Sequence, residues 1–412
     1  MLKLVVIADD LTGALDTGVK FAKCGIGTRI VTDEKLLNRI AGDEVAVLCA
    51  PTRHVSPQDA YLDLYQIASQ MIRAGIPFIY KKTDSVLRGN IGSELEALLR
   101  AGGKTPLPFI PAFPAMGRVT RDGVQLLNGI PISETEFRDD PLNPITTSNI
   151  KTIISTQSRV PVRCLRPGEL LERPENGQIL IIDAETEQDI ALIADRLDKL
   201  GLLHVTAGCA GFAEALRERI GFTMKPVRKP CLKRTMVVAC GSVNPITQRQ
   251  LEYAERHGFK RINLTESQKL NSARYIEEGC LETVLEIQQY CAAGYSVIFG
   301  TDRLDDMAGH SDGMTDGDET SVEAMIAAVL QRLMDQKLAT SLFVTGGDTF
   351  FAFLRRIGCT ELKPLYEVSD GVVLASLNYH GTVYEVLSKS GGFGEPDILP
   401  DLLKIYGDAQ SI

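Results

Sequence analysis

The sequence predicts an α/β protein with two domains, each built on a largely parallel sheet. Short apolar runs alternate along the chain with amphipathic helical patterns, as expected for strands that are covered by helices. A chain of 412 residues is also long for a single hydrophobic core. The stretch 223–235 holds five basic residues and two prolines and shows neither helical nor strand periodicity. We therefore interpret it as a linker between domains at 1–222 and 236–412.

Apolar runs mark the predicted strands. In the first domain these runs are 3–8, 45–49, 78–80, 109–111, 179–183 and 204–206. In the second domain they are 236–240, 296–300, 341–345, 372–376 and 382–387. Helical patterns lie between several of them, at 14–22, 56–74, 93–99, 187–200 and 321–334. Ligands bind at the carboxyl ends of the strands in open α/β sheets, so we expect functional side chains there.

Composition excludes several classes of protein. Hydrophobic residues make up 44% of the chain and charged residues 24%, as in ordinary globular proteins. The net charge of −9 argues against a nucleic-acid-binding surface. None of the nine cysteines forms a CxxC pair, so neither zinc nor a disulfide framework is indicated. No apolar run approaches the roughly 18 residues that span a bilayer, and we expect a cytoplasmic protein with a small-molecule ligand.

Two adjacent carboxylates follow the first predicted strand. Asp9 and Asp10 come directly after the apolar run 3–8. Carboxylates at a buried strand end are costly unless they meet a cation, a proton or a ligand. The alternative is that one of them only caps the helix that follows.

A basic segment follows the strand at 78–80. It contains Lys81, Lys82, Thr83, Asp84 and Ser85, and Arg88 comes three residues later. Cations and a helix N-terminus that converge at a strand end suit a carboxylate or phosphate ligand. The alternative is an internal network of ion pairs.

An arginine follows the strand at 45–49. Arg53 offers a forked set of donors suited to a carboxylate. An exposed loop arginine is the alternative, and for His54 beside it we favour a surface role.

Three glycine turns follow predicted strands of the second domain. They are the segments 240–242, 345–349 and 390–394. Glycines allow backbone amides to approach a ligand closely, as a phosphate site requires. None of the three matches the Walker pattern, and no GxGxxG follows the first strand, so a nucleotide site other than a dinucleotide fold is indicated.

In this order the segments resemble the four-carbon acid sugar kinases. The resemblance rests on ADDLTGALDTG at 8–18, TRH at 52–54, KKTDSVLRGNIGSEL at 81–95 and PAFPAMGR at 111–118, followed by CGSVNPITQRQL, TGGDT and KSGGFG in the second half. The run 134–150 is similar to the branch that acts on D-threonate, with D-erythronate next. Thr83 and Val86 stand where family members often carry other residues. These differences bear on which substrate is preferred and not on the kinase activity that the resemblance implies.

The resemblance implies a sugar-acid domain followed by an ATP domain, with the reaction in the cleft between them. It implies transfer of a phosphoryl group from ATP, with Mg2+, to the 4-hydroxyl of a four-carbon sugar acid. The implied substrate ligands are Asp9 or Asp10, Arg53, Lys82, Thr83, Asp84 and Ser85, and the charge of Arg88 adds to them. The implied ATP ligands are Ser242, Gly346, Gly347, Asp348, Thr349 and Gly391 or Gly392.

Several alternatives stay open at this point. A dehydrogenase or aldolase of the same acids, or a non-catalytic sensor, would share part of the pattern. For the catalytic carboxylate we favour the pair Asp9 and Asp10, because like charges tend to raise one pKa of a pair. Lys82 and Arg88 should lower the pKa of Asp84, which suits it to binding a second hydroxyl. The metal ligands, the stereochemistry of the substrate and the formation of a homo-oligomer are not determined by the sequence.

Overall fold

The computed structural model describes most of the chain as two compact units, Met1–Pro226 and Val227–Ile412. The described residues are 1–103, 105–140, 143–170, 172, 174–242, 244–300, 321–390 and 392–407. The boundary between the units falls inside the stretch 223–235, and the extent of a linker there stays a prediction. Within these described ranges, no helix is long and apolar enough to cross a membrane.

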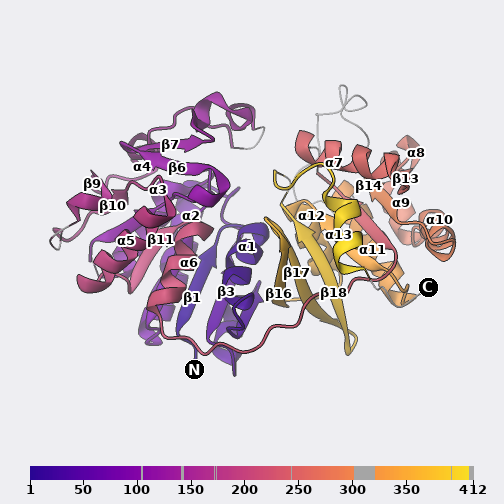
Figure 1. Ribbon diagram of the computed structural model, residues 1–412, viewed down its shortest axis with the longest axis horizontal. Coiled ribbons are helices and arrows are strands. Elements are labelled where there is room, and N and C mark those ends of the chain that lie inside the picture. Colours follow the sequence, from indigo (N-terminus) through magenta and orange to yellow (C-terminus); the bar gives the residue numbers. More distant parts are fainter. Residues whose placement is uncertain are drawn as a thin grey trace. The chain divides into compact units, whose positions relative to one another are not determined.

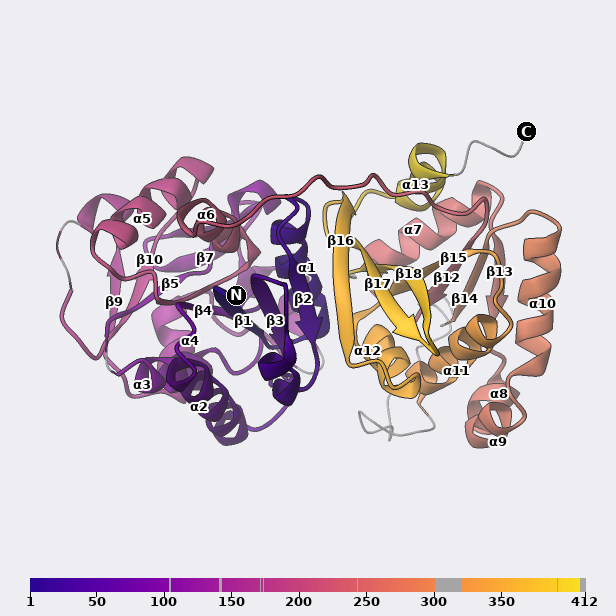
Figure 2. The same cartoon turned by 90° about the horizontal axis from the view of Figure 1, so that it is seen from below.

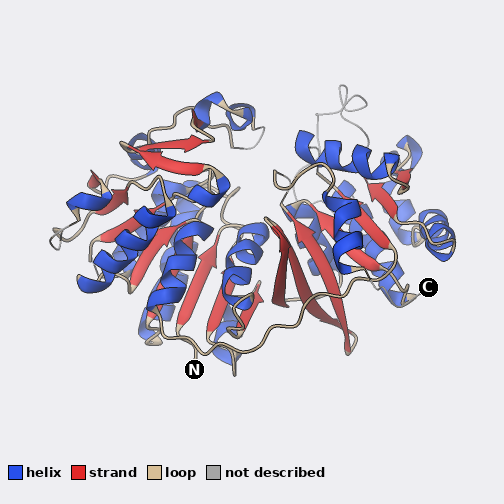
Figure 3. Cartoon of the chain, viewed as in Figure 1, coloured by secondary structure: helices blue, strands red, loops and turns tan. Residues whose placement is uncertain are grey.

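The first unit is built on a parallel sheet with the strand order β2-β3-β1-β4-β11-β5-β10-β9 (Figures 1 and 3). The strands are β1 (Leu4–Ala8), β2 (Thr28–Val31), β3 (Val45–Cys49), β4 (Phe78–Lys82), β5 (Leu107–Ile110), β9 (Val162–Leu165), β10 (Ile179–Ile182) and β11 (Val205–Gly208). The helices are α1 (Leu11–Ala22), α2 (Pro57–Arg73), α3 (Ile91–Ala101), α4 (Ile150–Gln157), α5 (Glu187–Lys199) and α6 (Ala210–Arg219). The predicted α/β class is confirmed for this half.

Helices cover both faces of this sheet. Figure 2 shows α5 and α6 on one face and α2 and α3 on the other. All five residues of β1 are buried, as expected for the centre of a parallel sheet. α2 buries an apolar stripe that begins at Ala60 and ends at Met71 and leaves its other side in water.

A small antiparallel sheet follows β5. Its strands are β6 (Arg118–Arg121), β7 (Val124–Leu127) and β8 (Ile130–Pro131). The sequence analysis predicted no strands between 111 and 179. Strands this short do not produce a readable alternation, and the turns between them carry the glycines that dominate the sequence pattern.

The second unit has a mixed sheet with the order β13-β14-β12-β15-β18-β17-β16. Its strands are β12 (Met236–Cys240), β13 (Lys260–Asn263), β14 (Val297–Gly300), β15 (Ser341–Thr345), β16 (Glu361–Ser369), β17 (Val372–Tyr379) and β18 (Thr382–Lys389). The helices are α7 (Pro245–Arg256), α8 (Glu266–Leu270), α9 (Ser272–Glu277), α10 (Leu281–Ala292), α11 (Val322–Asp335), α12 (Gly347–Arg356) and α13 (Ile398–Tyr406). The pairs from β13 to β18 are parallel, and β16, β17 and β18 form an antiparallel meander.

Candidate functional site

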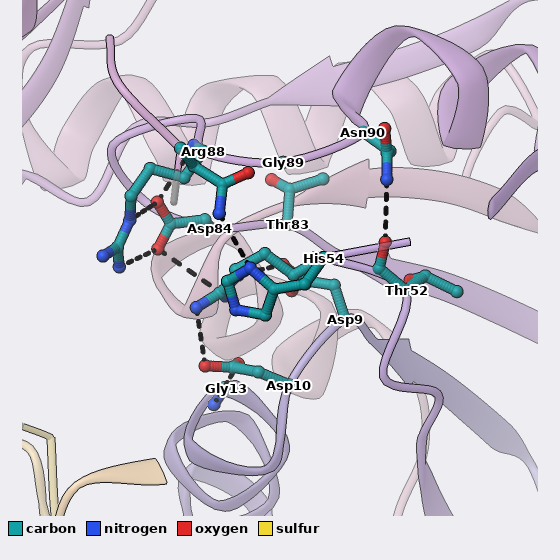
Figure 4. Close-up of polar contacts among 12 residues, drawn as sticks. Asp9, Asp10, Gly13, Thr52, His54, Thr83, Asp84, Arg88, Gly89 and Asn90 are labelled. Carbon is teal, nitrogen blue, oxygen red and sulfur yellow. Dashed lines mark hydrogen bonds and ion pairs between the residues drawn. The ribbon is translucent and has the colours of Figure 1, made fainter. Parts of the chain in front are cut away.

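Three strand ends meet at one edge of the first unit. β1 lies between β3 and β4, with Ala8 paired to Cys49 on one side and to Lys82 on the other. The residues that follow these strands therefore lie side by side. The structure brings Asp9, Asp10 and Asp84 together, as the sequence analysis expected of one strand edge (Figure 4). Arg53 forms ion pairs with all three.

Arg53 lies at the centre of this cluster. Its Nε donates to Asp9 Oδ2 and its Nη1 to Asp10 Oδ2, both at 2.8 Å. Its Nη2 lies 3.7 Å from Asp84 Oδ1. The guanidinium thus holds three carboxylates in place, so we reinterpret the predicted ligand Arg53 as a group that orients carboxylates.

Asp84 forms a two-pronged ion pair with Arg88. The Arg88 Nε lies 2.9 Å from Asp84 Oδ2, and Nη2 lies 3.1 Å from Asp84 Oδ1. Nη1 of the same arginine donates to Asp140 at 3.1 Å, and the guanidinium stacks on the Phe137 ring. Burial opposes ionisation of Asp84, but Arg88 and Arg53 hold its pKa well below the usual range.

Asp9 and Asp10 differ sharply in exposure. The side chain of Asp9 is 3% exposed and that of Asp10 is 24% exposed. Asp9 Oδ1 is buried without a hydrogen-bond partner. Burial favours the neutral acid, but Arg53, Lys81 and Lys82 lower the pKa of Asp9, so the expected rise from like-charge repulsion does not occur at this residue.

The Asp10 carboxylate contacts both the start of α1 and Arg53. Its Oδ1 accepts a hydrogen bond from the backbone N–H of Gly13 at 2.8 Å and caps α1, so the cap interpretation is correct for this residue. Its Oδ2 is held by Arg53, and the carboxylate stays partly open to solvent. Of the two aspartates, Asp10 is the one a ligand can reach.

Lys81 and Glu94 form a further, buried ion pair in the first unit. Lys81 is fully buried and its Nζ lies 3.2 Å from Glu94 Oε1, which also accepts a hydrogen bond from the Thr52 hydroxyl. Burial and the charge of Asp9 raise the pKa of Glu94 despite Lys81. For Lys81, the alternative of an internal ion pair is therefore correct.

The remaining predicted ligands of this edge point in different directions. The Lys82 ammonium donates to the Thr83 carbonyl at 2.8 Å, and a Cβ on Gly13 would lie only 3.1 Å from it. Thr83 is fully buried, with its hydroxyl on the Gly208 carbonyl at 3.3 Å. Ser85 is partly exposed, and its hydroxyl accepts a bond from Arg118 Nε at 3.2 Å.

The N-terminus of α3 has a side-chain partner from another helix. The helix begins at Ile91, and the N–H groups of Gly92 and Ser93 donate to Gln157 Oε1 at 2.8 and 3.4 Å. The Asn90 amide donates to the Thr52 and Val55 carbonyls, so it fixes the loop that carries Arg53. The anion site expected at this helix end stays a prediction, and two of the N–H groups there already donate to a glutamine of α4.

The glycine turns of the second unit follow three neighbouring strands. Thr345 is paired with Cys240 of β12 on one side and with Lys389 of β18 on the other. The turns that begin at Gly241, Gly346 and Ser390 therefore share one strand edge. This register is the arrangement that a phosphate site at the carboxyl ends of parallel strands requires.

Gly346 has a backbone that favours glycine. Its φ is +105°, and a Cβ there would lie 3.1 Å from Thr349 Oγ1 and 3.6 Å from the Ser242 backbone nitrogen. Gly346 is the N-cap of α12, and no side chain caps the free N–H groups of that helix. Such an N-terminus favours an anion.

The other predicted nucleotide ligands lie around this helix end. Gly347 and Asp348 are in the first turn of α12, where Asp348 is exposed, and Thr349 is buried. Ser242 is partly exposed and its hydroxyl accepts from the Asn244 N–H at 3.3 Å. Gly392 has open space around its Cα, and the predicted ligand Gly391 lies outside the described residues.

Sequence reasoning missed a buried polar side of α7. Thr247, Gln248 and Gln250 are at most 4% exposed. Gln248 donates to the Ser242 carbonyl at 2.8 Å, and Gln250 donates to carbonyls of residues 393–395. The signal was the polar run TQRQ at 247–250, near the start of a helix that must bury one side.

No cluster of three or more histidine, cysteine or acidic side chains suited to a metal occurs in the part of the chain that the structure describes. Magnesium in phosphoryl transfer is commonly held by one or two carboxylates together with the nucleotide phosphates. The exposed Asp348 carboxylate fits that donor requirement.

Comparison with known protein families assigns each half a role. A family model described as a sugar-binding N-terminal domain matches residues 4–216. A second, described as a nucleotide-binding C-terminal domain, matches residues 237–399.

Relatives match along the whole chain. A D-threonate kinase of Salmonella typhimurium is 30% identical over 98% of this chain and 98% of its own length. A D-erythronate kinase of Heliobacterium modesticaldum is 27% identical over 96% of this chain and 95% of its own. A crystal structure of a protein from Salmonella typhimurium LT2 has a TM-score of 0.77 at 22% identity, covers 96% of this chain and 98% of its own, and supports the fold alone.

Proposed function

Because this chain belongs to the family of four-carbon acid sugar kinases, a family of phosphotransferases, we propose that its substrate is D-threonate and its phosphoryl donor ATP with Mg2+. The observation that carries the donor assignment is the register of three glycine turns at the ends of β12, β15 and β18. The relative at 30% identity supports the choice of acceptor. The cytoplasmic location and the oligomeric state stay predictions.

The charged edge of the first unit is proposed to bind the sugar acid. Carboxylates accept hydrogen bonds from hydroxyls, and cations are needed for the acid group of the substrate. Arg88 and Ser85 are partly exposed there and can meet the ligand directly. Lys82 is proposed to add positive charge to this site, and the carbonyl of the buried Thr83 holds the Lys82 ammonium in place.

Asp10 is proposed to orient the attacking 4-hydroxyl and to take its proton. The acceptor must lie within hydrogen-bond reach of that hydroxyl, and Asp10 is more exposed than Asp9. Arg53 holds Asp10 Oδ2, and the α1 N-terminus holds its Oδ1, so the carboxylate has a fixed direction. Asp84 is proposed to bind a second hydroxyl, because Arg88 keeps it ionised and weakly basic.

The glycine-rich edge of the second unit is proposed to bind the nucleotide phosphates. Ser242, Gly346, Gly347, Thr349, Gly391 and Gly392 would present N–H and hydroxyl groups. Asp348 is proposed to face the magnesium ion, directly or through water. The ion would neutralise the charge that develops on the phosphates during transfer.

The experiment is a measurement of ADP formation with MgATP and each four-carbon aldonic acid in turn. We expect D-threonate to give the highest kcat/KM and D-erythronate to be the second candidate, since a relative that is 27% identical carries that name. The dehydrogenase, aldolase and sensor alternatives would form no ADP with any of these acids.

A further inference from the structure

A buried lysine and a buried glutamine reach the same turn in the second unit. The turn is the segment 392–395 after β18, which Figure 1 shows beside α7. Lys389 is 2% exposed and Gln250 is 1% exposed. Burial of an ammonium or an amide is costly unless its donors are hydrogen-bonded.

Both side chains donate to backbone carbonyls of this turn. Lys389 Nζ donates to the carbonyls of Ser390 at 2.9 Å and Phe393 at 3.1 Å, and to the Thr247 hydroxyl at 3.3 Å. Gln250 Nε2 donates to the carbonyls of Phe393 at 2.9 Å, Gly394 at 2.7 Å and Glu395 at 3.2 Å. Two buried donors therefore share the Phe393 carbonyl.

The direction of these carbonyls fixes the direction of the amides that follow. In a trans peptide the C=O of one residue and the N–H of the next point in opposite directions, and the described chain has no cis peptide. With the carbonyls of Phe393 and Gly394 turned inward, the N–H groups of Gly394 and Glu395 turn outward. Gly394 is half-buried and Glu395 is exposed, so this side of the turn lies at the protein surface.

Gly394 is required by the same arrangement. Its φ is +88°, and a Cβ would lie 2.6 Å from Ile398 Cδ1 and 3.2 Å from Gln250 Nε2. Successive outward N–H groups next to a glycine with positive φ form an anion-binding concavity. Burial lowers the pKa of Lys389 to about 7, because it disfavours the charged form of the ammonium.

We propose that Lys389 and Gln250 are positioning residues that hold the 392–395 turn with the N–H groups of Gly394 and Glu395 directed at a nucleotide phosphate. This inference rests on the proposed nucleotide site and adds to it two side chains that do not touch the ligand. Because the N–H groups address phosphate, their loss should weaken binding of ADP and leave binding of adenosine almost unchanged.

The test compares ADP and adenosine binding by calorimetry in Lys389→Met and Gln250→Met. Met is of similar length and lacks a donor. We expect the Kd of ADP to rise roughly tenfold in each variant, and the Kd of adenosine to change less than about twofold. Gln331→Met is the matched control, because Gln331 of α11 bonds the side chains of Tyr379 and Arg356 and should leave both affinities unchanged.

Equal losses for ADP and adenosine, or unchanged ADP affinity, would overturn the proposal. If Lys389→Met does not fold, Gln250→Asn gives the same comparison, since it keeps the amide and shortens its reach by one methylene. Wild-type protein that binds neither ligand would instead contradict the proposed nucleotide site, so the two failures are distinguishable.

Discussion

The candidate edge of the first unit consists of charged side chains, whereas the candidate edge of the second unit consists of glycine turns. In the first unit, charged side chains that follow β1, β3 and β4 meet in a network around Arg53 and Arg88. In the second unit, glycine turns after β12, β15 and β18 present backbone. Side chains differ in shape and charge, whereas backbone N–H groups suit any phosphate.

This difference assigns selectivity to the first edge. A network of carboxylates and guanidinium groups can distinguish hydroxyl configurations, because an unpaired buried polar group is costly. The edge that we propose for the nucleotide would need only to hold phosphates in place. Buried side chains of α7 and Lys389 donate hydrogen bonds to the carbonyls of its turns. The predictions below test this division.

The largest effect is expected for the chemical step. Asp10→Asn keeps an oxygen that can cap α1 but removes the proton acceptor, so single-turnover transfer at saturating substrates should fall about 10²- to 10⁴-fold. Asp84→Asn should mainly raise the KM of the sugar acid. If only Asp84→Asn loses the chemical step, the two roles must be exchanged.

A large effect on nucleotide binding is expected for Gly346→Val. The φ of +105° and the contact with Thr349 should displace the turn and weaken ATP binding roughly 100-fold. Gly381→Val is the matched control, because Gly381 also has a positive φ but open space around it. Equal losses of ATP affinity in both variants would show that general strain, and not the turn, is responsible.

A smaller effect on the sugar acid is expected for Arg53→Ala. Its loss leaves Asp9 and Asp10 without their shared cation and should raise the KM of the sugar acid about 30-fold, or ~2 kcal/mol. The KM of ATP should stay nearly constant. Arg29→Ala removes a partly buried arginine paired with Asp43 in the same unit and serves as the control. An unchanged KM for the sugar acid in Arg53→Ala would contradict the assignment of the sugar acid to the edge around Arg53.

The smallest effect concerns stability against pH. The folded-state pKa of Asp84 is lowered, so its ion pairs stabilise the fold above the unfolded pKa of about 4 and lose that effect as the pH falls toward the folded value. At every pH between 5 and 7, Asp84→Asn should therefore have a free energy of unfolding about 2 kcal/mol lower than that of the wild type. The gap between variant and wild type should narrow below about pH 4 in urea titrations. A gap that widens in acid would contradict this ionisation.

Much of the fold was readable from the sequence because buried parallel strands are continuous apolar runs. The runs at 45–49, 236–240 and 341–345 match β3, β12 and β15. The glycine turns were found because they follow such runs directly. The strands of the small sheet β6–β8 were missed, since their length is too short for a pattern.

Contacts between distant segments could not be predicted. Whether Lys81 faced a ligand or Glu94 depended on the packing of α3 against the sheet, and Gln157 reached α3 from 64 or more residues away. The role of Gln250 depends on a turn that lies 143 residues later. Residue types at a strand end predict which groups gather there, but partners are set by tertiary packing.

The most direct test of the division between the two edges is a crossed binding experiment by calorimetry. D-threonate and ADP are each titrated into Arg53→Ala and Gly346→Val. We predict that Arg53→Ala loses affinity for D-threonate and keeps ADP, whereas Gly346→Val loses ADP and keeps D-threonate. If D-threonate binding depends on Gly346, or ADP binding on Arg53, the assignment of the two ligands to the two edges is wrong.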